Sequence, residues 1–327
     1  MTEQHQQHDV VGIGNALVDV LSQEHDSFLE RFAMTKGAMD LIDTARAEEL
    51  YAAMSDVREA SGGSAANTLA GVASFGSQAA FIGRVHDDGL GASFAHDLSA
   101  NGVRFVSEPT AGGDPTGRCL IVVTPDGQRT MNTYLGAAAA FGPGQLDAEV
   151  IAAARVTYLE GYLFDRPPAR EAFHEAARIA HEAGGKIATT LSDSFCVTRH
   201  QDEWHRLIEH GTDILFANEA EITTLFPGSF EAALDAVRGK VEIACLTRSE
   251  HGSVIVTADA VHEVAAVRVP QVVDTTGAGD LYAAGVLHGY TRGYELPRCG
   301  ELGSLAAAAV IGHIGARPGA SLAQLVS

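Results

Sequence analysis

A chain of 327 residues with 46% apolar and 20% charged residues has the composition of a folded globular protein, which excludes wholesale disorder. Its 22 basic residues stand against 42 acidic ones, a formal charge of −20, and no basic cluster interrupts that balance. Nucleic acid and anionic membranes are therefore not expected partners. An anionic substrate would need backbone dipoles, a metal ion and one or two arginines to neutralise it.

The four cysteines, at positions 119, 196, 245 and 299, are far apart and form no CxxC motif, which predicts reduced thiols rather than a disulfide framework or a zinc site. Residues 1–9 lack the basic and apolar regions of a signal peptide, and no apolar run reaches the ~18 residues of a membrane span. We therefore expect a cytoplasmic protein, either a monomer or a homodimer.

Short apolar runs alternate with alanine-rich helical stretches along most of the chain. The expected strands cover residues 10–13, 79–85, 156–159, 186–189, 213–216 and 243–246, and the expected helices cover residues 65–74, 91–100, 169–183, 204–210 and 230–237. This alternation predicts an α/β fold with a doubly wound, mainly parallel sheet flanked by helices.

Two β-rich stretches interrupt the alternation. Residues 15–60 mix strand-like pieces with a helix at 44–54, and residues 104–135 resemble a hairpin around the turn Pro125-Asp126-Gly127. We expect one domain, residues 1–327, in which both stretches pair into a small lid over the carboxyl edge of the main sheet, where ligands bind. The alternative is two unrelated surface excursions.

The segment that carries most chemical information is Asp274-Thr275-Thr276-Gly277-Ala278-Gly279-Asp280, between a strand-like run at 267–273 and a helical run at 281–290. Amides at the start of a helix can converge on an anion, which the helix dipole also favours. Asp280 would lie beside that anion hole, as phosphoryl transfer to an alcohol requires: the amides hold the phosphoryl oxygens while the carboxylate orients the hydroxyl and accepts its proton. In isolation, the same glycines could form a simple turn.

Two earlier segments suit a substrate with a vicinal diol. Gly12-Ile13-Gly14-Asn15-Ala16-Leu17-Val18-Asp19 ends in a carboxylate that can accept two hydroxyl donors, and Gly62-Gly63-Ser64-Ala65-Ala66-Asn67 combines close backbone approach with an amide that donates and accepts. Taken alone, the first is an exposed carboxylate at a strand end. The second is the start of a tightly packed helix.

These three segments, with residues 81–91, resemble in order and spacing the signatures of the PfkB (ribokinase-like) carbohydrate and nucleoside kinases. The resemblance spans nearly the whole chain. It implies a ribokinase-like fold and ATP-dependent phosphorylation of an alcohol, with Asp280 as base and the amides of Gly277, Ala278 and Gly279 as anion hole. The residues it assigns to the acceptor are Asn15, Asp19, Gly63, Ser64 and Asn67, and we add Tyr162 at the mouth of the site.

The nucleotide side rests on weaker matches. Asn218 and Glu221 have the spacing of a helix capping box, and the resemblance also places such a pair near Mg²⁺ and the triphosphate; the two roles are compatible. Further residues that the resemblance places beside ATP are Thr247, Arg248, Gly252 and Thr275, although Ser249 stands where the family commonly has glycine. Arg129 matches an arginine that clamps phosphate in adenosine kinases, with a surface charge as the alternative. Asp274 matches a monovalent-cation site, which adds K⁺ to ATP and Mg²⁺.

The acceptor is predicted from apolar candidates around the mouth of the site: Phe32, Met34, Met39, Leu41, Met131, Tyr162 and Phe164. Such residues provide the stacking faces that a purine needs, although they are also ordinary core residues. Residues 28–37 and 190–195 resemble the adenosine kinase branch, with Thr190 where asparagine is common. We expect phosphorylation of a primary hydroxyl of a purine nucleoside; the alternative is a sugar such as ribose, fructose or ketogluconate.

Proteins of other classes fit less well. Gly12-Ile13-Gly14 follows a strand as in dinucleotide-dependent oxidoreductases, but Leu17 occupies the place of the third glycine. A catalytically silent nucleotide- or sugar-binding protein on the same scaffold is the remaining alternative, and the intact Asp280 segment counts against it.

Overall fold

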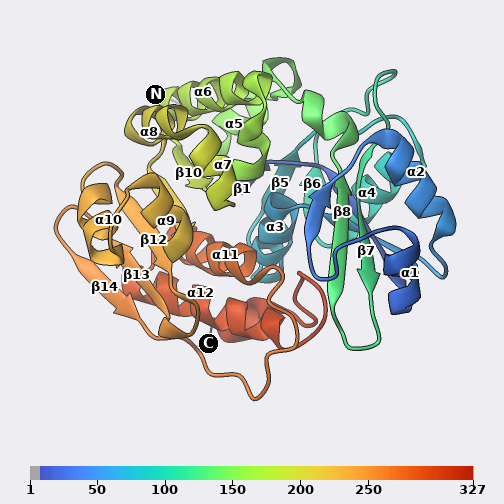
Figure 1. Ribbon diagram of the computed structural model, residues 1–327. Coiled ribbons are helices and arrows are strands. Elements are labelled where there is room, and N and C mark those ends of the chain that lie inside the picture. The colour runs from blue at the N-terminus through green and yellow to red at the C-terminus, as the bar shows by residue number, and fades with distance from the viewer. Residues whose placement is uncertain (1–7, 327) are drawn as a thin grey trace.

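The computed structural model describes residues 8–326; residues 1–7, which the prediction about a signal peptide concerns, lie outside the described residues. A nine-stranded sheet forms its centre, in the order β14-β13-β12-β11-β10-β9-β1-β5-β6 (Figure 1). The strands are β1 (His8–Ile13), β5 (Ala79–Ile82), β6 (Val103–Phe105), β9 (Ala154–Glu160), β10 (Lys186–Thr190), β11 (Ile214–Asn218), β12 (Ile243–Thr247), β13 (Ser253–Val256) and β14 (Val261–Val264). All neighbours from β12 to β6 pair in parallel, and β13 and β14 add an antiparallel edge. The predicted fold class is confirmed.

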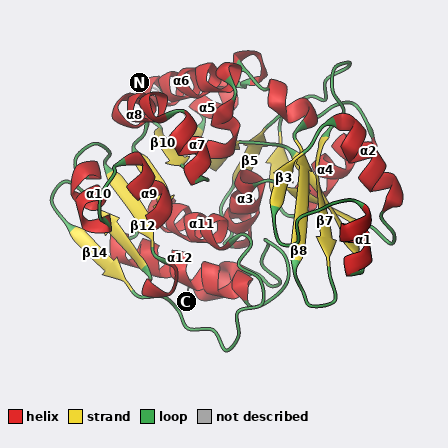
Figure 2. Ribbon diagram, viewed as in Figure 1, coloured by secondary structure: helices red, strands yellow, loops and turns green. Residues whose placement is uncertain are grey.

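Helices cover both faces of this sheet, as Figure 2 shows. One face carries α3 (Ser64–Ser74), α4 (Gly89–Ala100), α11 (Ala278–Thr291) and α12 (Leu296–Ile311). The other carries α5 (Ala148–Ala152), α6 (Pro167–Glu182), α7 (Ser194–Arg199), α8 (Gln201–Gly211), α9 (Glu219–Leu225) and α10 (Phe230–Val237). Val10 and Val11 belong to different cores, one on each face. Strands buried on both sides explain the continuous apolar runs in the sequence.

A second sheet of five strands, here called the small sheet, stands beside the carboxyl edge of the large one (Figure 1). Its order is β3 (Met39–Leu41), β8 (Arg129–Tyr134), β7 (Gly117–Val123), β2 (Leu17–Gln23) and β4 (Arg58–Gly62), accompanied by α1 (Asp26–Arg31) and α2 (Thr44–Ala53). The two β-rich stretches of the sequence therefore pair with each other, with Asp19 opposite Cys119. The second stretch enters the small sheet only at Gly117, because β6 pairs with β5 in the large sheet.

The strand expected at residues 267–273 is wrong. The chain has no regular secondary structure between β14 and α11, and the valines at 267, 272 and 273 are exposed. Pro270 has no N–H to give to a ladder, and the amide of Val273 bonds to the carbonyl of Ile311 at the end of α12. Short 3₁₀ turns complete the structure at Gly136–Ala140, Pro143–Gln145, Gly161–Asp165, Ser249–His251 and Leu322–Leu325. Within residues 8–326, no helix combines the length and apolarity that crossing a bilayer demands.

Candidate active site

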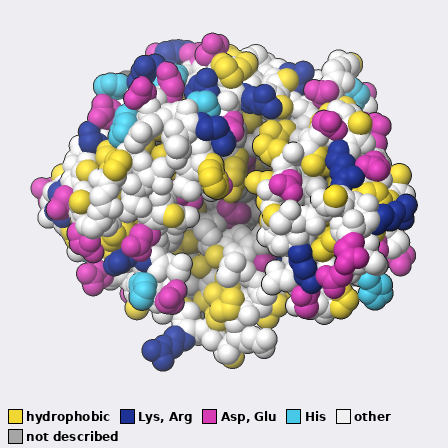
Figure 3. All heavy atoms as spheres, in the orientation of Figure 1, with side chains coloured by type: hydrophobic (Ala, Val, Ile, Leu, Met, Phe, Trp, Pro, Cys, Tyr) yellow, Lys and Arg dark blue, Asp and Glu magenta, His cyan; other side chains and the backbone are white. Residues whose placement is uncertain are grey.

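The site is a cleft of about 640 Å³ at the carboxyl ends of the parallel strands. Residues at or just after the ends of β1, β9, β10, β11 and β12 line it: Asn15, Tyr162, Thr190, Asn218 and Thr247. The small sheet forms the opposite wall, and the N-terminus of α11 closes one end. Figure 3 shows this hollow between the two parts of the molecule, with acidic side chains inside it. Parallel strands bring residues that are far apart in the sequence to a single edge.

Free backbone amides lie at the start of α11. Gly277 adopts a left-handed conformation, φ +79°, and a Cβ there would lie 2.6 Å from the carbonyl oxygen of Ala316. The amide of Ala278 bonds back to the carbonyl of Thr275 at 3.2 Å. Among the described residues, the amides of Gly277, Gly279 and Asp280 have no acceptor. The structure therefore leaves three donors at the positive end of the helix, with Asp280 in place of the expected Ala278.

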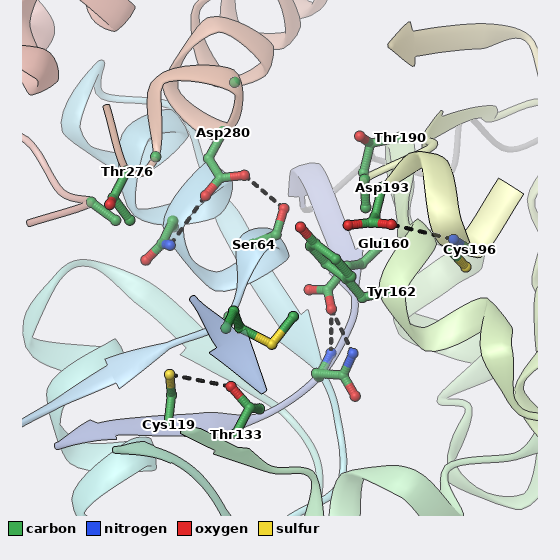
Figure 4. A pocket seen from close by; sticks show the side chains of 18 of the residues that line it. Ser64, Cys119, Thr133, Glu160, Tyr162, Thr190, Asp193, Cys196, Thr276 and Asp280 are labelled. Carbon is green, nitrogen blue, oxygen red and sulfur yellow. Dashed lines mark hydrogen bonds between the residues drawn. The ribbon is translucent and has the colours of Figure 1, made fainter. Parts of the chain in front are cut away.

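Asp280 lies next to these amides, in the first turn of α11. Its Oδ1 accepts a hydrogen bond from Ser64 Oγ at 2.6 Å, and its Oδ2 accepts one from Asn67 Nδ2 at 3.1 Å (Figure 4). Burial raises the pKa of Asp280 to about 6, while the two hydrogen bonds act in the opposite direction by favouring the charged form. The carboxylate is thus ionised at neutral pH, and each oxygen retains a lone pair for a substrate proton.

Asp19, on β2, faces the cleft with a free carboxylate. Within the described part of the chain, no donor hydrogen-bonds to it. It packs so closely on Gly62 that a Cβ there would lie 2.3 Å from its Oδ1. Burial and the neighbouring charge of Asp280 raise the pKa of Asp19 to about 6, although Arg317 and Arg129 oppose the shift. Asp19 therefore offers unused acceptor capacity at the place where the sequence predicts an acceptor diol.

Glu160, the last residue of β9, was missed by the sequence analysis. Its Oε1 accepts from the backbone N and the Nδ2 of Asn15 at 3.2 and 2.7 Å (Figure 4). Its Oε2 accepts from the amide of Ala65 at 2.8 Å. Burial raises the pKa of Glu160 to about 7 against these hydrogen bonds. Gly63 has φ +95°, and a Cβ there would lie 2.4 Å from the carbonyl oxygen of Asn15. The sequence signal for Glu160 is that a charged residue directly follows the apolar run 156–159, at the expected end of a strand.

Asn218 and Glu221 line the opposite part of the cleft and form the capping box expected from their spacing. Asn218 donates to Glu221 from its backbone N at 3.0 Å and from Nδ2 at 2.6 Å, and Glu221 N donates to Asn218 Oδ1 at 2.8 Å. Burial, with the charges of Asp193 and Asp280, raises the pKa of Glu221 to about 7. Asp193, in the predicted segment 190–195, caps α7 and also lines the cleft, although the sequence assigned it no role.

These donors fit a sparsely held Mg²⁺ better than a protein cage. No group of three His, Cys, Asp or Glu side chains within residues 8–326 is arranged to hold a metal ion. Mg²⁺ usually keeps several waters and needs only one or two carboxylates besides substrate phosphates. Glu221 and Asp193 at the cleft wall satisfy that requirement.

Arg129 and Asp274 form an ion pair. Arg129, on β8, lines the cleft, whereas Asp274 does not. Asp274 also accepts from the backbone N and the Oγ1 of Thr276 at 2.9 and 2.6 Å and from the amide of Gly315 at 2.9 Å. Burial tends to raise the pKa of Asp274, but these hydrogen bonds and Arg129 lower it to about 2. Both oxygens of Asp274 are thus hydrogen-bonded within the protein, and its role in a monovalent-cation site stays a prediction.

Of the other residues predicted to lie beside ATP, some line the cleft and others lie outside it. Thr247 and Thr275 line the cleft. Arg248 lies outside its lining, stacked over Phe230 at 4.2 Å and paired with Glu219 at 3.2 Å. Gly252, also outside, has φ +84°, and a Cβ there would lie 2.1 Å from a backbone oxygen. This tight turn requires glycine, and the predicted place of Gly252 beside ATP stays a prediction.

The small sheet gives the cleft an apolar wall, made of Leu17, Met39, Leu41, Ile121, Met131 and Leu135. Met39 and Leu41 are 47% and 60% exposed, and the rim residues Tyr162 and Phe195 are 44% and 72% exposed. Phe32 and Phe164 were predicted to lie at the mouth of the site, but both are buried. Phe32 belongs to the core on the α3 and α11 face of the large sheet, where Met34 packs against it, and Phe164 belongs to the core on the opposite face.

Comparison with known proteins places this geometry among kinases. The pfkB family carbohydrate kinase model matches residues 32–322. The adenosine kinase of Saccharomyces cerevisiae is 24% identical over 330 residues, which cover 94% of this chain and 95% of that protein. A 5-dehydro-2-deoxygluconokinase of Geobacillus kaustophilus is 26% identical over 262 residues, covering 76% and 78%.

Two solved structures are more similar. The adenosine kinase from Sinorhizobium meliloti is 52% identical with a TM-score of 0.89, and a probable sugar kinase from Rhizobium etli CFN 42 is 49% identical with a TM-score of 0.90. Each alignment covers 98% of both chains. The names of these similar proteins include both nucleoside and sugar kinases.

Proposed function

We propose that this chain, which belongs to the pfkB family of carbohydrate kinases, uses ATP to phosphorylate the primary hydroxyl of a purine nucleoside. Family membership makes it a phosphotransferase with a hydroxyl group as acceptor. The observation that carries the proposal is the position of Asp280. Its carboxylate lies beside three amides, in a cleft that also contains the carboxylate of Asp19, and none of these groups has a hydrogen-bond partner of its own within residues 8–326 apart from the Ser64 and Asn67 donors to Asp280.

The residues of the chain divide the reaction between them. Asp280 orients the attacking hydroxyl and accepts its proton as the new bond forms; because an alcohol is a very weak acid, the proton moves late and orientation is the larger part of the role. Ser64 and Asn67 keep the carboxylate in place by donating to both of its oxygens. The amides of Gly277, Gly279 and Asp280 stabilise the negative charge of the transferring group without having to reorient.

Asp19 and Asn15 hold the acceptor. The free carboxylate of Asp19 suits the two hydroxyls of a ribose, and Glu160 fixes the amide of Asn15 beside it. On the donor side, Glu221 and Asp193 are the carboxylates that would hold Mg²⁺, through water, and Asn218 keeps Glu221 in place by donating to both of its oxygens. Mg²⁺ bound there would neutralise negative charge on the phosphates of ATP.

The apolar wall supports a nucleoside over a free sugar. Flat, apolar faces such as those of Leu17, Ile121 and Met131 suit a purine ring, whereas a small sugar would need polar groups at the same places. The similarity to the Sinorhizobium meliloti adenosine kinase points the same way. A sugar acceptor is the second candidate, favoured by the comparable similarity to the probable sugar kinase from Rhizobium etli.

An ATP-consumption screen with Mg²⁺ tests the proposal. Adenosine, other purine nucleosides, ribose, fructose and ketogluconate are compared at equal concentration, each with and without K⁺. We expect the highest kcat/KM with a purine nucleoside and a product phosphorylated at the primary hydroxyl, identified by phosphorus NMR. A preference for a sugar would replace the nucleoside assignment, and turnover with none of these acceptors would favour a silent binding protein.

A further inference from the structure

Arg317 lies in the C-terminal segment that follows α12. It does not line the cleft. Its guanidinium donates from Nη1 to Asp97 Oδ2 at 3.0 Å and from Nη2 to Ser61 Oγ at 2.7 Å, and Nη2 also bonds to the carbonyl of Ser61. Its Nε donates to Asn67 Oδ1 at 3.4 Å. A planar guanidinium with this many partners is held in one orientation.

The contact with Asn67 matters because of what the same amide does on its other side. Asn67 is 7% exposed, and its Nδ2 donates to Asp280 Oδ2 at 3.1 Å. An asparagine amide has one acceptor oxygen and one donor nitrogen, whereas a guanidinium only donates and an ionised carboxylate only accepts. Only one orientation of the amide satisfies both neighbours. The flipped amide would set two donors against each other at Arg317 and two acceptors against each other at Asp280.

We propose that Arg317 is a positioning residue for Asp280: it fixes the amide of Asn67 so that Nδ2 faces the Asp280 carboxylate. This inference rests on the proposed function, in which Asp280 is the base. The contacts of Arg317 with Ser61 and Asp97 serve as its anchor, because Asp97 Oδ2 also accepts from the backbone N and the Oγ of Ser61 at 2.8 and 2.5 Å. The chain of contacts thus runs from α4 through Arg317 and α3 to α11.

The test is the pH profile of kcat/KM, which reports the ionisation of groups in the free enzyme. Arg317→Met leaves Asn67 free to rotate and deprives Asp280 of a steady donor. A hydrogen bond donated to a carboxylate lowers its pKa by about 1 unit. We therefore expect the acid limb, the pH range in which kcat/KM falls as Asp280 becomes protonated, to move to higher pH by about 1 unit. Arg317→Met then loses more of its kcat/KM at low pH than at pH values well above the acid limb. Arg317→Lys keeps the charge but cannot hold all three partners, and should move the limb less.

Asn67→Ala separates this role from a general effect of charge or stability. If Arg317 acts through Asn67, Arg317→Lys added to Asn67→Ala, which keeps the charge that also lowers the pKa of Asp19, shifts the acid limb no further than Asn67→Ala alone. A further shift of similar size in the double variant would overturn the proposal, as would an unshifted limb in both single Arg317 variants. Because Arg317→Lys preserves the charge, the position of the acid limb can be measured in this variant even if Arg317→Met fails to fold.

Arg298 offers a matched control. It also anchors the C-terminal segment, donating to the carbonyls of Leu325 and Val326 at 3.3 and 3.2 Å, and it pairs with Glu301 on α12. Arg298→Met should lower the melting temperature without moving the acid limb. The two proposals also fail differently: undiminished turnover in Asp280→Asn contradicts the base, whereas an inactive Asp280→Asn with unshifted Arg317 variants contradicts only the positioning role.

Discussion

Glu160 accepts two hydrogen bonds from Asn15, from the backbone N at 3.2 Å and from Nδ2 at 2.7 Å. Its other oxygen accepts from the amide of Ala65, one residue beyond Ser64. One buried carboxylate therefore sets the position of two segments that face the acceptor, the end of β1 and the start of α3. Because Nδ2 of Asn15 is committed to Glu160, its Oδ1 remains as the group that can receive a hydroxyl donor.

Glu160→Gln should weaken acceptor binding. Glutamine has a single acceptor oxygen, so its amide nitrogen must face either Asn15 or the amide of Ala65, and an unsatisfied buried donor costs about 1–3 kcal/mol. We expect a higher KM for the acceptor, a nearly unchanged KM for ATP and a lower melting temperature. Glu250→Gln, at an exposed side chain, is the control. An acceptor KM equal to that of the unaltered protein would contradict the role given to Glu160.

The same substitution should change how stability depends on pH. Burial raises the pKa of Glu160 from 4.5 to about 7, so between these values the folded protein binds this proton more tightly than the unfolded chain does. The resulting stability is present below pH ~4.5 and is lost as pH rises through ~7. Glu160→Gln removes that loss. Chemical denaturation at pH 5 and pH 7.5 should therefore show a smaller fall in the free energy of unfolding for the variant; equal falls would show that Glu160 does not titrate in this range.

Asp280→Asn should reduce kcat at least ~10²-fold, the usual scale for loss of a general base, with little change in acceptor affinity measured by calorimetry. Burial raises the pKa of Asp280 to about 6, so the kcat/KM profile of the unaltered protein should fall below about pH 6 as the carboxylate becomes protonated. Asp259→Asn, at an exposed turn, controls for loss of a negative charge. Near-normal turnover in Asp280→Asn would remove this residue from the mechanism.

Asp19→Ala should erase the preference for an acceptor with ribose hydroxyls. The carboxylate of Asp19 has no donor from the described residues, so its loss removes hydroxyl contacts, worth about 1–3 kcal/mol, without breaking a hydrogen bond to those residues. The measurement compares binding of adenosine and 2′,3′-dideoxyadenosine. The unaltered protein should bind adenosine more tightly, and the variant should bind the two about equally. A preference that survives in the variant would place the hydroxyls elsewhere.

Three glycine substitutions should separate backbone strain from function at the start of α11. Gly277→Ala places a Cβ 2.6 Å from the carbonyl of Ala316 in a left-handed conformation, so it should lose both stability and turnover. Gly293→Ala has the same backbone strain, φ +75°, with nothing within 4 Å, and should cost only about 1–2 kcal/mol of stability. Gly279→Ala also meets nothing within 4 Å but lines the cleft. It should fold normally and raise the KM for ATP; an unchanged KM would argue against phosphate at these amides.

The sequence predicts the parts of the site whose signals are local. The glycines before α11 and the Asn218–Glu221 capping box depend on neighbouring residues, and the structure contains both the helix start and the cap. Glu160 and Arg317 escaped prediction because their partners are far away in the chain: Asn15 is 145 residues from Glu160, and Asn67 is 250 residues from Arg317. The strand expected at 267–273 failed because β-branched residues favour a strand only where a neighbouring strand and a buried face exist.

The small sheet should become protected when the acceptor binds, as expected of a lid. Its strands contribute Leu17, Ile121 and Met131 to the cleft wall, and Met39 and Leu41 on β3 are 47% and 60% exposed. Covering them with a purine ring would bury apolar surface and favour a closed arrangement. Hydrogen exchange with and without adenosine should show slower exchange in β2, β3, β7 and β8. The amides of β13 and β14, at the far edge of the large sheet, serve as the internal control. Equal exchange of the small sheet in both states would mean that it is a fixed wall.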